Sequence, residues 1–295
     1  MKESIEQTLL AWKAKAMEPS TFCGCEASEE ISRFTLFGAP FDGATSFRPG
    51  ARFAPQEMRD NSWGLETYSP RLDRDLEDIL VADLGDLALS AASSEEALAR
   101  VEAAISFLLE HKKIPVMIGG DHSMTLGAIR AAFRTYPDLH VVHFDAHTDL
   151  RDSFYDNPLS HACVIRRVYE LLGDQRIHSF GIRAGLREEF LFARRHLDFH
   201  PFSLKEVSLL SDTIGKAPIY VTIDLDVLDP SLFPGTGTPE PDGVSFAELM
   251  YALSIVGELN VIGTDLMELS PPCDVSGAST VTACKVLREW LLMIQ

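Results

Sequence analysis

The sequence is poor in basic residues and contains no long apolar run. Lysine and arginine total 26 residues against 44 of aspartate and glutamate, which gives a formal net charge of −18 at pH 7. Nucleic acids and anionic membrane surfaces attract clustered positive charge, so we expect neither as a partner. No stretch approaches the roughly 18 apolar residues that a spanning helix needs, and the N-terminus has no apolar signal segment. We therefore expect a cytoplasmic protein.

Cysteine is also scarce. The five cysteines follow no disulfide-scaffold spacing, so we expect reduced thiols. Cys23 and Cys25 lie close together, but no second group of cysteines or histidines stands nearby to complete a zinc site. The apolar share of 46% and the charged share of 24% are those of an ordinary globular protein, and at 295 residues the chain can bury a substantial core.

Short apolar runs rich in valine and isoleucine alternate with longer amphipathic segments along most of the chain. This alternation is typical of βαβ units and predicts a parallel sheet of seven or eight strands. Ser93 and Glu96 form the sequence pattern of a capping box, which predicts a helix running toward His111. The expected strands are residues 34–37, 79–82, 114–118, 140–144, 177–180, 219–223 and 261–262. The other expected helices are residues 126–133, 163–172, 246–256 and 280–293.

No linker divides the chain into separate domains. Residues 31–295 are expected to form a single domain, and residues 1–30 an N-terminal extension, for which a helix is one interpretation. Residues 230–243 are rich in proline and glycine, but they fit a long loop beside a strand end better than a domain boundary.

Polar residues that can bind metal directly follow three of the expected strands. They are His122 after residues 114–118; Asp145, His147 and Asp149 after residues 140–144; and Asp224 and Asp226 after residues 219–223. In an open α/β sheet, ligands bind beyond the carboxyl ends of the strands, so the three groups can converge on one crevice. A spacing of two residues on extended backbone also places neighbouring members of a group on one face.

Four carboxylates gathered in a dry site would repel one another, and desolvating each costs several kcal/mol. Cations must therefore be present, and a carboxylate-rich set with few imidazoles suits Mn²⁺ better than structural zinc. A single aspartate after a strand is more often a helix cap or a turn residue. A single histidine is more often structural, and we assign His143 and His178 that role. The joint pattern nevertheless favours a metal site.

Three ordered motifs resemble those of the ureohydrolases, the family of arginases, agmatinases, guanidinobutyrases and formimidoylglutamases. They are GGDHS at residues 119–123, DAHTD at residues 145–149 and IDLDVLDP at residues 223–230. The resemblance covers nearly the whole chain from about Phe34 onward. It implies a three-layer α/β/α sandwich around a mainly parallel eight-stranded sheet, and assembly as a homotrimer or a homohexamer.

The resemblance also implies a role for each candidate site residue. One Mn²⁺ would be held by His122, Asp145, Asp149 and Asp224, and a second by Asp145, His147, Asp224 and Asp226. Glu268 resembles the carboxylate that receives the guanidinium of the substrate, and His161 the loop histidine that helps to move protons. Asp149 is the best candidate for delivering a proton to the leaving amine. The GTGT run at residues 235–238 would border the active site.

The reaction implied is the hydrolysis of a small guanidino compound by a hydroxide that bridges two manganese ions. Agmatine, cleaved to putrescine and urea, is the expected substrate. Alternatives are a guanidinobutyrase or another ureohydrolase, a deacetylase that uses one zinc, and an inactive homologue that only binds metal. Intact Glu268 and His161 oppose the inactive homologue, because a structural metal site needs neither.

The segment after the DAHTD motif bears on the substrate. Residues 151–157 read RDSFYDN, which departs from the arginase pattern and resembles bacterial agmatinases. Asp152 or Asp156 would favour the ammonium of agmatine, together with the acidic surface. Arg151 is the counter-evidence: pointing inward it would pair with the carboxylate of 4-guanidinobutyrate, and pointing outward it would pair with an acidic neighbour. We favour the outward position.

Overall fold

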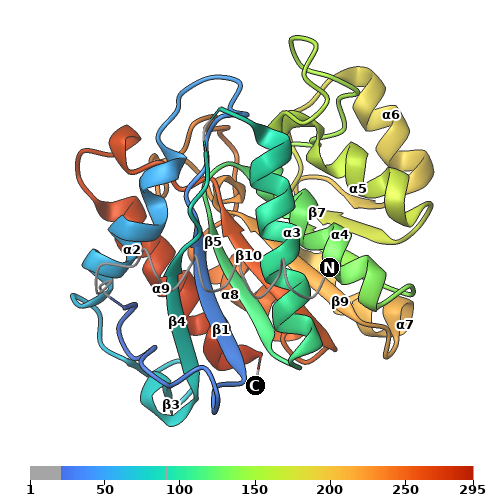
Figure 1. Cartoon of the computed structure of the whole chain (residues 1–295). Coiled ribbons are helices and arrows are strands. Elements are labelled where there is room, and N and C mark those ends of the chain that lie inside the picture. The colour runs from blue at the N-terminus through green and yellow to red at the C-terminus, as the bar shows by residue number, and fades with distance from the viewer. Residues whose placement is uncertain (1–20, 91, 295) are drawn as a thin grey trace.

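The computed structural model of the chain describes residues 21–90 and 92–294. Its centre is an eight-stranded sheet in the order β4-β1-β5-β10-β9-β6-β7-β8 (Figure 1), in which every neighbouring pair is parallel. The strands are β1 (Phe34–Ala39), β4 (Val81–Asp86), β5 (Ile114–Gly119), β6 (His140–Phe144), β7 (Ile177–Phe180), β8 (Asp198–His200), β9 (Ile219–Asp224) and β10 (Val261–Met267). A separate antiparallel pair joins β2 (Tyr68–Ser69) and β3 (Arg74–Asp75).

Helices cover both faces of the sheet, which confirms the three-layer α/β/α sandwich. One apolar core lies between the sheet and α2, α7, α8 and α9, and a second lies between the sheet and α3, α4, α5 and α6. The helices are α2 (Ala54–Ser62), α3 (Ser94–Glu110), α4 (Thr125–Thr135), α5 (Val164–Leu172), α6 (Arg187–His196), α7 (Leu210–Ile214), α8 (Phe246–Val256) and α9 (Ala278–Met293). Strand side chains alternate between the two cores, so most strands are apolar throughout.

The expected strands and helices were largely confirmed, with differences where charge or brevity hid an element. The strand expected at residues 79–82 is β4, which starts later and continues through Asp83 and Asp86. Both carboxylates are sequestered by the buried Arg59, whose guanidinium lies 2.8 Å from Asp83 Oδ2 and 2.5 Å from Asp86 Oδ1. The three-residue β8 and the polar helices α2 and α6 lack a strong apolar periodicity and were not expected.

Residues just before the first strand pack against the domain. Phe22 and Cys25 are buried in the core that contains α2 and α9, and Glu26 forms an isolated bridge with Ala82 of β4. The helix considered for the N-terminal extension falls mostly on residues 1–20, which lie outside the described residues. The five cysteines are free thiols. Within the described residues, no helix has the length and apolar character needed to cross a membrane.

Candidate metal centre

Four adjacent strands of the sheet deliver the candidate residues to one edge. These strands are neighbours in the order β5-β10-β9-β6, and because they are parallel their carboxyl ends lie at the same edge. His122 follows β5, Glu268 follows β10, Asp224 ends β9, and Asp145 follows β6. We name the set His122, Asp145, His147, Asp149, Asp224 and Asp226 the ligand cluster. The sequence placed these residues at one crevice, and the structure brings all six together.

The loop that carries His122 passes very close to the loop after β1. An added Cβ at Gly120 would lie 1.7 Å from the carbonyl oxygen of Phe41, so only glycine fits there. The backbone N–H of Asp121 donates to that same carbonyl at 2.7 Å. Gly120 of the GGDHS motif therefore lets the turn after β5 lie against its neighbour, which fixes where His122 projects.

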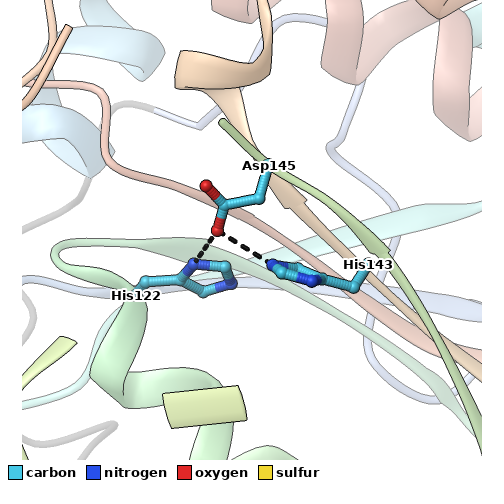
Figure 2. Close-up of side chains that lie close together, drawn as sticks. All are labelled: His122, His143 and Asp145. Carbon is cyan, nitrogen blue, oxygen red and sulfur yellow. Dashed lines mark hydrogen bonds and ion pairs between the residues drawn. The ribbon is translucent and has the colours of Figure 1, made fainter. Parts of the chain in front are cut away.

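One imidazole nitrogen of His122 faces three carboxylates. Nδ1 lies 3.1 Å from Asp145 Oδ2, 3.1 Å from Asp224 Oδ2 and 3.4 Å from Asp149 Oδ2. Figure 2 shows His122 and His143 approaching the same oxygen of Asp145. His122 is fully buried, and this nitrogen has no hydrogen-bond partner within the described residues. A bare nitrogen among carboxylate oxygens is the arrangement that a cation needs.

A second convergence lies on the other side of Asp145. His147 Nδ1 is 3.0 Å from Asp226 Oδ2 and 3.5 Å from Asp145 Oδ1. The Oδ2 atom of Asp226 is buried and has no hydrogen-bond partner in the part of the chain that the structure describes. Asp145 thus takes part in two groups of three potential ligands, one with His122 and His143 and one with His147 and Asp226.

Backbone amides hold the aspartates in this orientation. The N–H of His147 donates to Asp145 Oδ1 at 2.5 Å, that of Asp226 to Asp224 Oδ1 at 2.9 Å, and that of Ala146 to Asp226 Oδ1 at 3.1 Å. In each carboxylate one oxygen is fixed by the backbone, and the other faces an imidazole. This division is typical of preorganised metal ligands, whose orientation is set by the groups around them.

The electrostatics of the cluster show why a cation belongs there. Burial raises the pKa of Asp224 well above its ordinary value, and the charges of Asp226 and Asp145 raise it further. Burial opposes protonation of His122, but the facing carboxylates outweigh it and raise its pKa well above the ordinary value. Two imidazoles cannot balance four buried carboxylates. The donor set fits divalent cations that prefer oxygen and imidazole ligands.

His143 is not an independent ligand. Its Nε2 lies 2.9 Å from Asp145 Oδ2 and its Nδ1 lies 3.1 Å from Ser179 Oγ, so both ring nitrogens are occupied. The structural role expected for it therefore includes fixing a member of the ligand cluster. A metal-binding aspartate is commonly oriented in this way by a hydrogen bond from a neighbouring group.

Glu268 and His161 lie beside the ligand cluster and contact each other. Glu268 Oε1 accepts from the backbone N–H of His122 at 2.8 Å and lies 2.8 Å from His161 Nδ1, whereas its Oε2 has no hydrogen-bond partner within the described residues. On its other side, His161 Nε2 lies 2.7 Å from Ser46 Oγ. Asp149 and Glu268 have φ values of 49° and 65°, a left-handed conformation that is strained for these residues and is often found at functional sites.

A cavity of about 230 Å³ opens over the ligand cluster. His161, Thr238 and Arg151 are among its lining residues, so the GTGT run does border it. The Arg151 guanidinium lies 5.1 Å from the centre of the Phe154 ring, which also lines the cavity. Arg151 therefore lies at the cavity wall, in contrast to the outward position favoured from the sequence.

The acidic residues at the wall differ from those anticipated. Asp152 is exposed and pairs with Arg167 at 3.1 Å, and Asp156 is exposed as well. Glu189 and Glu240 line the cavity instead. Both were missed because Glu189 lies in a polar helix and Glu240 in an irregular loop, and neither local pattern indicates which way the side chain faces.

Arg183 is a further residue that the sequence reasoning missed. Its guanidinium donates to backbone carbonyls, at 2.7 Å to Asp226 and at 2.9 Å to Glu240. It also donates to the carbonyl of Val227 at 3.1 Å. Arg183 thereby joins the turn that carries part of the ligand cluster to the loop that carries Glu240. The planar fork of arginine suits such multiple contacts, and lysine could not reproduce them.

The fold and the ligand cluster define an α/β protein with a cation-binding crevice at the carboxyl edge of a parallel sheet. Residues 32–293 match the Arginase family. An agmatinase from Bacillus cereus is 41% identical over 285 residues, which are 94% of this chain and 97% of that protein. An N(1)-aminopropylagmatine ureohydrolase from Thermococcus kodakarensis is 40% identical over 265 residues, which are 88% of this chain and 89% of that protein.

A solved structure agrees with these sequence matches. The crystal structure of agmatine ureohydrolase of Thermoplasma volcanium has a TM-score of 0.87 and 32% identity, and the match covers 95% of this chain and 96% of that one. The chain belongs to the Arginase family. The family resemblance read from the three motifs is thereby confirmed.

Proposed function

We propose that this protein hydrolyses agmatine to putrescine and urea at a binuclear manganese site. The observation that carries the proposal is the ligand cluster. In it, His122 Nδ1 and Asp226 Oδ2, which lack hydrogen-bond partners in the described part of the chain, face potential metal ligands on either side of Asp145. Membership of the Arginase family and about 40% identity to agmatinases over nearly the full chain support it.

The ligands would divide between the two ions as the family resemblance implies. His122, Asp145, Asp149 and Asp224 would hold one ion, and Asp145, His147, Asp224 and Asp226 the other. Asp145 and Asp224 would contact both. When bound, two Mn²⁺ ions lower the pKa of a shared water toward neutrality and so supply a hydroxide nucleophile. Everything else in the reaction falls to side chains of this chain.

Glu268 would bind and orient the guanidinium. Its Oε1 is held by the His122 amide and His161, so Oε2 is the atom left to accept from a guanidinium N–H. Contact with His161 more than offsets burial and lowers the pKa of Glu268, so the group is ionised. A charge-assisted hydrogen bond to a fixed carboxylate offsets the desolvation of the cation and keeps its central carbon in place for attack.

Asp149 and His161 would handle protons. Asp149 Oδ2 lies 3.4 Å from His122 Nδ1 and Asp149 lines the cavity, which places it to pass a proton to the leaving amine. Burial opposes protonation of His161, but Glu268 outweighs it and raises the pKa of His161 to about 9. Because His161 also lines the cavity, it can pass protons between the site and solvent.

The cavity wall supports agmatine, although it leaves one specific alternative. Beyond the ligand cluster, Glu189 and Glu240 line the cavity, and their carboxylates would suit the distal ammonium of agmatine. Arg151 is the observation that favours 4-guanidinobutyrate, since its guanidinium could pair with the carboxylate of that compound. Two carboxylates against one guanidinium make agmatine the preferred substrate.

The proposal is tested by urea release from a panel of guanidines after loading with Mn²⁺. Agmatine should have a higher specificity constant than 4-guanidinobutyrate or arginine when all are supplied at matched low concentrations. Faster cleavage of 4-guanidinobutyrate would replace agmatine as the substrate, and no urea from any compound would remove the activity itself. Assembly as a trimer or hexamer stays a prediction, to be tested by light scattering.

A further inference from the structure

Behind His122, on the side away from the ligand cluster, a chain of hydroxyl groups ends at a buried carboxylate. His122 Nε2 lies 2.8 Å from Thr222 Oγ1. Thr222 of β9 is the register partner of Asp265 of β10, so the two side chains share a face of the sheet. Asp265 Oδ2 accepts from Thr125 Oγ1 at 2.9 Å and from the Tyr220 hydroxyl at 3.0 Å.

Burying Asp265 has a high cost in desolvation free energy. It is fully buried, and its Oδ1 has no hydrogen-bond partner within residues 21–90 and 92–294. Burial raises the pKa of Asp265, whereas His122 and the neighbouring hydroxyl groups, including those of Thr125 and Tyr220, oppose the rise. Hydrogen bonds from neutral hydroxyls alone do not offset the desolvation of a carboxylate, which costs several kcal/mol. A carboxylate in this position is therefore expected to serve a purpose beyond packing.

The direction of the hydrogen bonds supplies that purpose. A carboxylate only accepts, so each hydroxyl that contacts Asp265 must point its hydrogen toward it. Thr125 Oγ1 lies 3.4 Å from Thr222 Oγ1, and because the Thr125 hydrogen points to Asp265, Thr125 can only accept from Thr222. With its own hydrogen directed to Thr125, Thr222 Oγ1 turns its lone pairs toward His122 Nε2. That nitrogen must then carry the ring proton, which leaves the lone pair of Nδ1 free toward the three facing carboxylates.

We propose that Asp265 is a positioning residue for the metal ligand His122, acting through Thr125 and Thr222. It fixes both the tautomer and the orientation of the imidazole, with a threonine in the place where a carboxylate usually contacts a metal-bound histidine directly. The inference rests on the proposed metal centre. It adds a residue on a fourth strand to the groups that determine metal binding.

The test measures Mn²⁺ binding to metal-free protein by isothermal titration calorimetry. Asp265→Asn keeps the shape but can turn a donor toward Thr125. It should weaken the binding of one of the two Mn²⁺ ions by about 10- to 100-fold, while the second ion binds nearly as before. Thr222→Val should act in the same way, and Thr222→Ser, which keeps the hydroxyl, should restore binding. Unchanged affinity for both ions in Asp265→Asn would overturn the inference.

Thr264→Val is the matched control. Thr264 is buried next to Asp265 on β10, but its hydroxyl accepts from Trp290 Nε1 at 3.0 Å, and no hydrogen bond among the described residues joins it to His122. It should lower the melting temperature without changing either affinity. If Asp265→Asn does not fold, Thr222→Val becomes the decisive variant. Equal Mn²⁺ affinities in Thr222→Val and Thr264→Val would then refute the positioning role proposed for Asp265. Wild-type protein that binds no Mn²⁺ would refute the proposed metal centre instead.

Discussion

Two clusters of histidine and aspartate lie on the same sheet, and they are built on opposite principles. The ligand cluster stands at the carboxyl ends of β5, β9 and β6. The second, which we name the edge cluster, consists of His140, His178, Asp198 and His200 on β6, β7 and β8. Both contain residue types that bind metals, so residue type alone does not distinguish them.

In the edge cluster the hydrogen-bond donors and acceptors are matched to one another. Asp198 Oδ2 lies 2.7 Å from His178 Nδ1, and Asp198 Oδ1 lies 2.7 Å from His200 Nε2. His178 Nε2 in turn lies 2.9 Å from His140 Nδ1. One carboxylate serves two imidazoles and both of its oxygens are occupied. Such a cluster is stable without a cation.

In the ligand cluster the carboxylates outnumber the imidazoles, and His122 Nδ1 and Asp226 Oδ2 have no hydrogen-bond partner among the residues that the structure describes. The comparison teaches that excess negative charge together with unsatisfied buried atoms marks a cation site. A balanced set of the same residue types marks a structural network. Breaking one member of each cluster should therefore have very different consequences.

The largest effect is expected for Asp224→Asn. This residue would contact both ions, so its loss should remove at least one ion and nearly all urea production. Metal content after dialysis, measured by mass spectrometry beside the activity, checks the expectation. A variant that retains two ions and normal turnover would contradict the assignment.

His161→Ala should lower kcat by roughly 10- to 1000-fold, because a proton-transfer group is lost. Two ions should remain bound, since His161 contacts Glu268 and Ser46 and not the ligand cluster. Kinetics and metal analysis of the same preparation separate the two effects. Loss of metal in this variant would make His161 a ligand.

Glu268→Gln should reduce kcat/KM by about 10- to 100-fold, the loss expected when a hydrogen bond to a charged group becomes neutral. The amide preserves shape, so metal content should not change. Steady-state kinetics with agmatine measure the effect. An unaltered Michaelis constant and rate would dismiss the guanidinium role of Glu268.

Asp198→Asn, in the edge cluster, should have the smallest effect. Metal content and turnover should match the wild type, and the free energy of unfolding should fall by about 1 kcal/mol or less. Burial disfavours ionised Asp198, but hydrogen bonds with His178 and His200 outweigh it and lower its pKa. Loss of metal from this variant would remove the distinction between the two clusters.

The stability difference should also depend on pH. Asp198 contributes stability above its ordinary pKa of 3.8 and loses it as the pH falls through the lower folded value. A hydrogen bond with Asp198 raises the pKa of His200, so His200 contributes fully below its ordinary value of 6.5 and loses this as the pH rises. Urea denaturation should therefore show a larger difference between wild type and Asp198→Asn at pH 5.5 than at pH 8.

Much of the fold and of the ligand cluster could be predicted because both follow from strand patterns. Apolar strands followed at once by aspartate and histidine indicate a parallel sheet and the crevice at its edge. Glu189, Glu240 and Ser46 could not be found in this way, since their place at the site depends on how distant loops fold. Arg183 was missed as well. Among the described residues its guanidinium contacts only backbone carbonyls, so its place too depends on how distant loops fold.

Asp265 did leave a signal. A carboxylate stands inside the otherwise uncharged stretch Val261–Met267, but the predicted strand ended at residue 262. Asp83 and Asp86, both paired with the buried Arg59, extended β4 beyond its predicted end in the same manner. Charges inside strands are hidden from patterns of apolarity, because their partners come from other elements.

The most direct test of the central claim is a titration of metal-free protein with Mn²⁺ while urea release from agmatine is followed in the same sample. Activity should be absent without metal and should rise until two ions are bound per chain. Full activity with no ion or with a single ion would contradict the binuclear site. Recovery with Zn²⁺ alone would favour the deacetylase alternative.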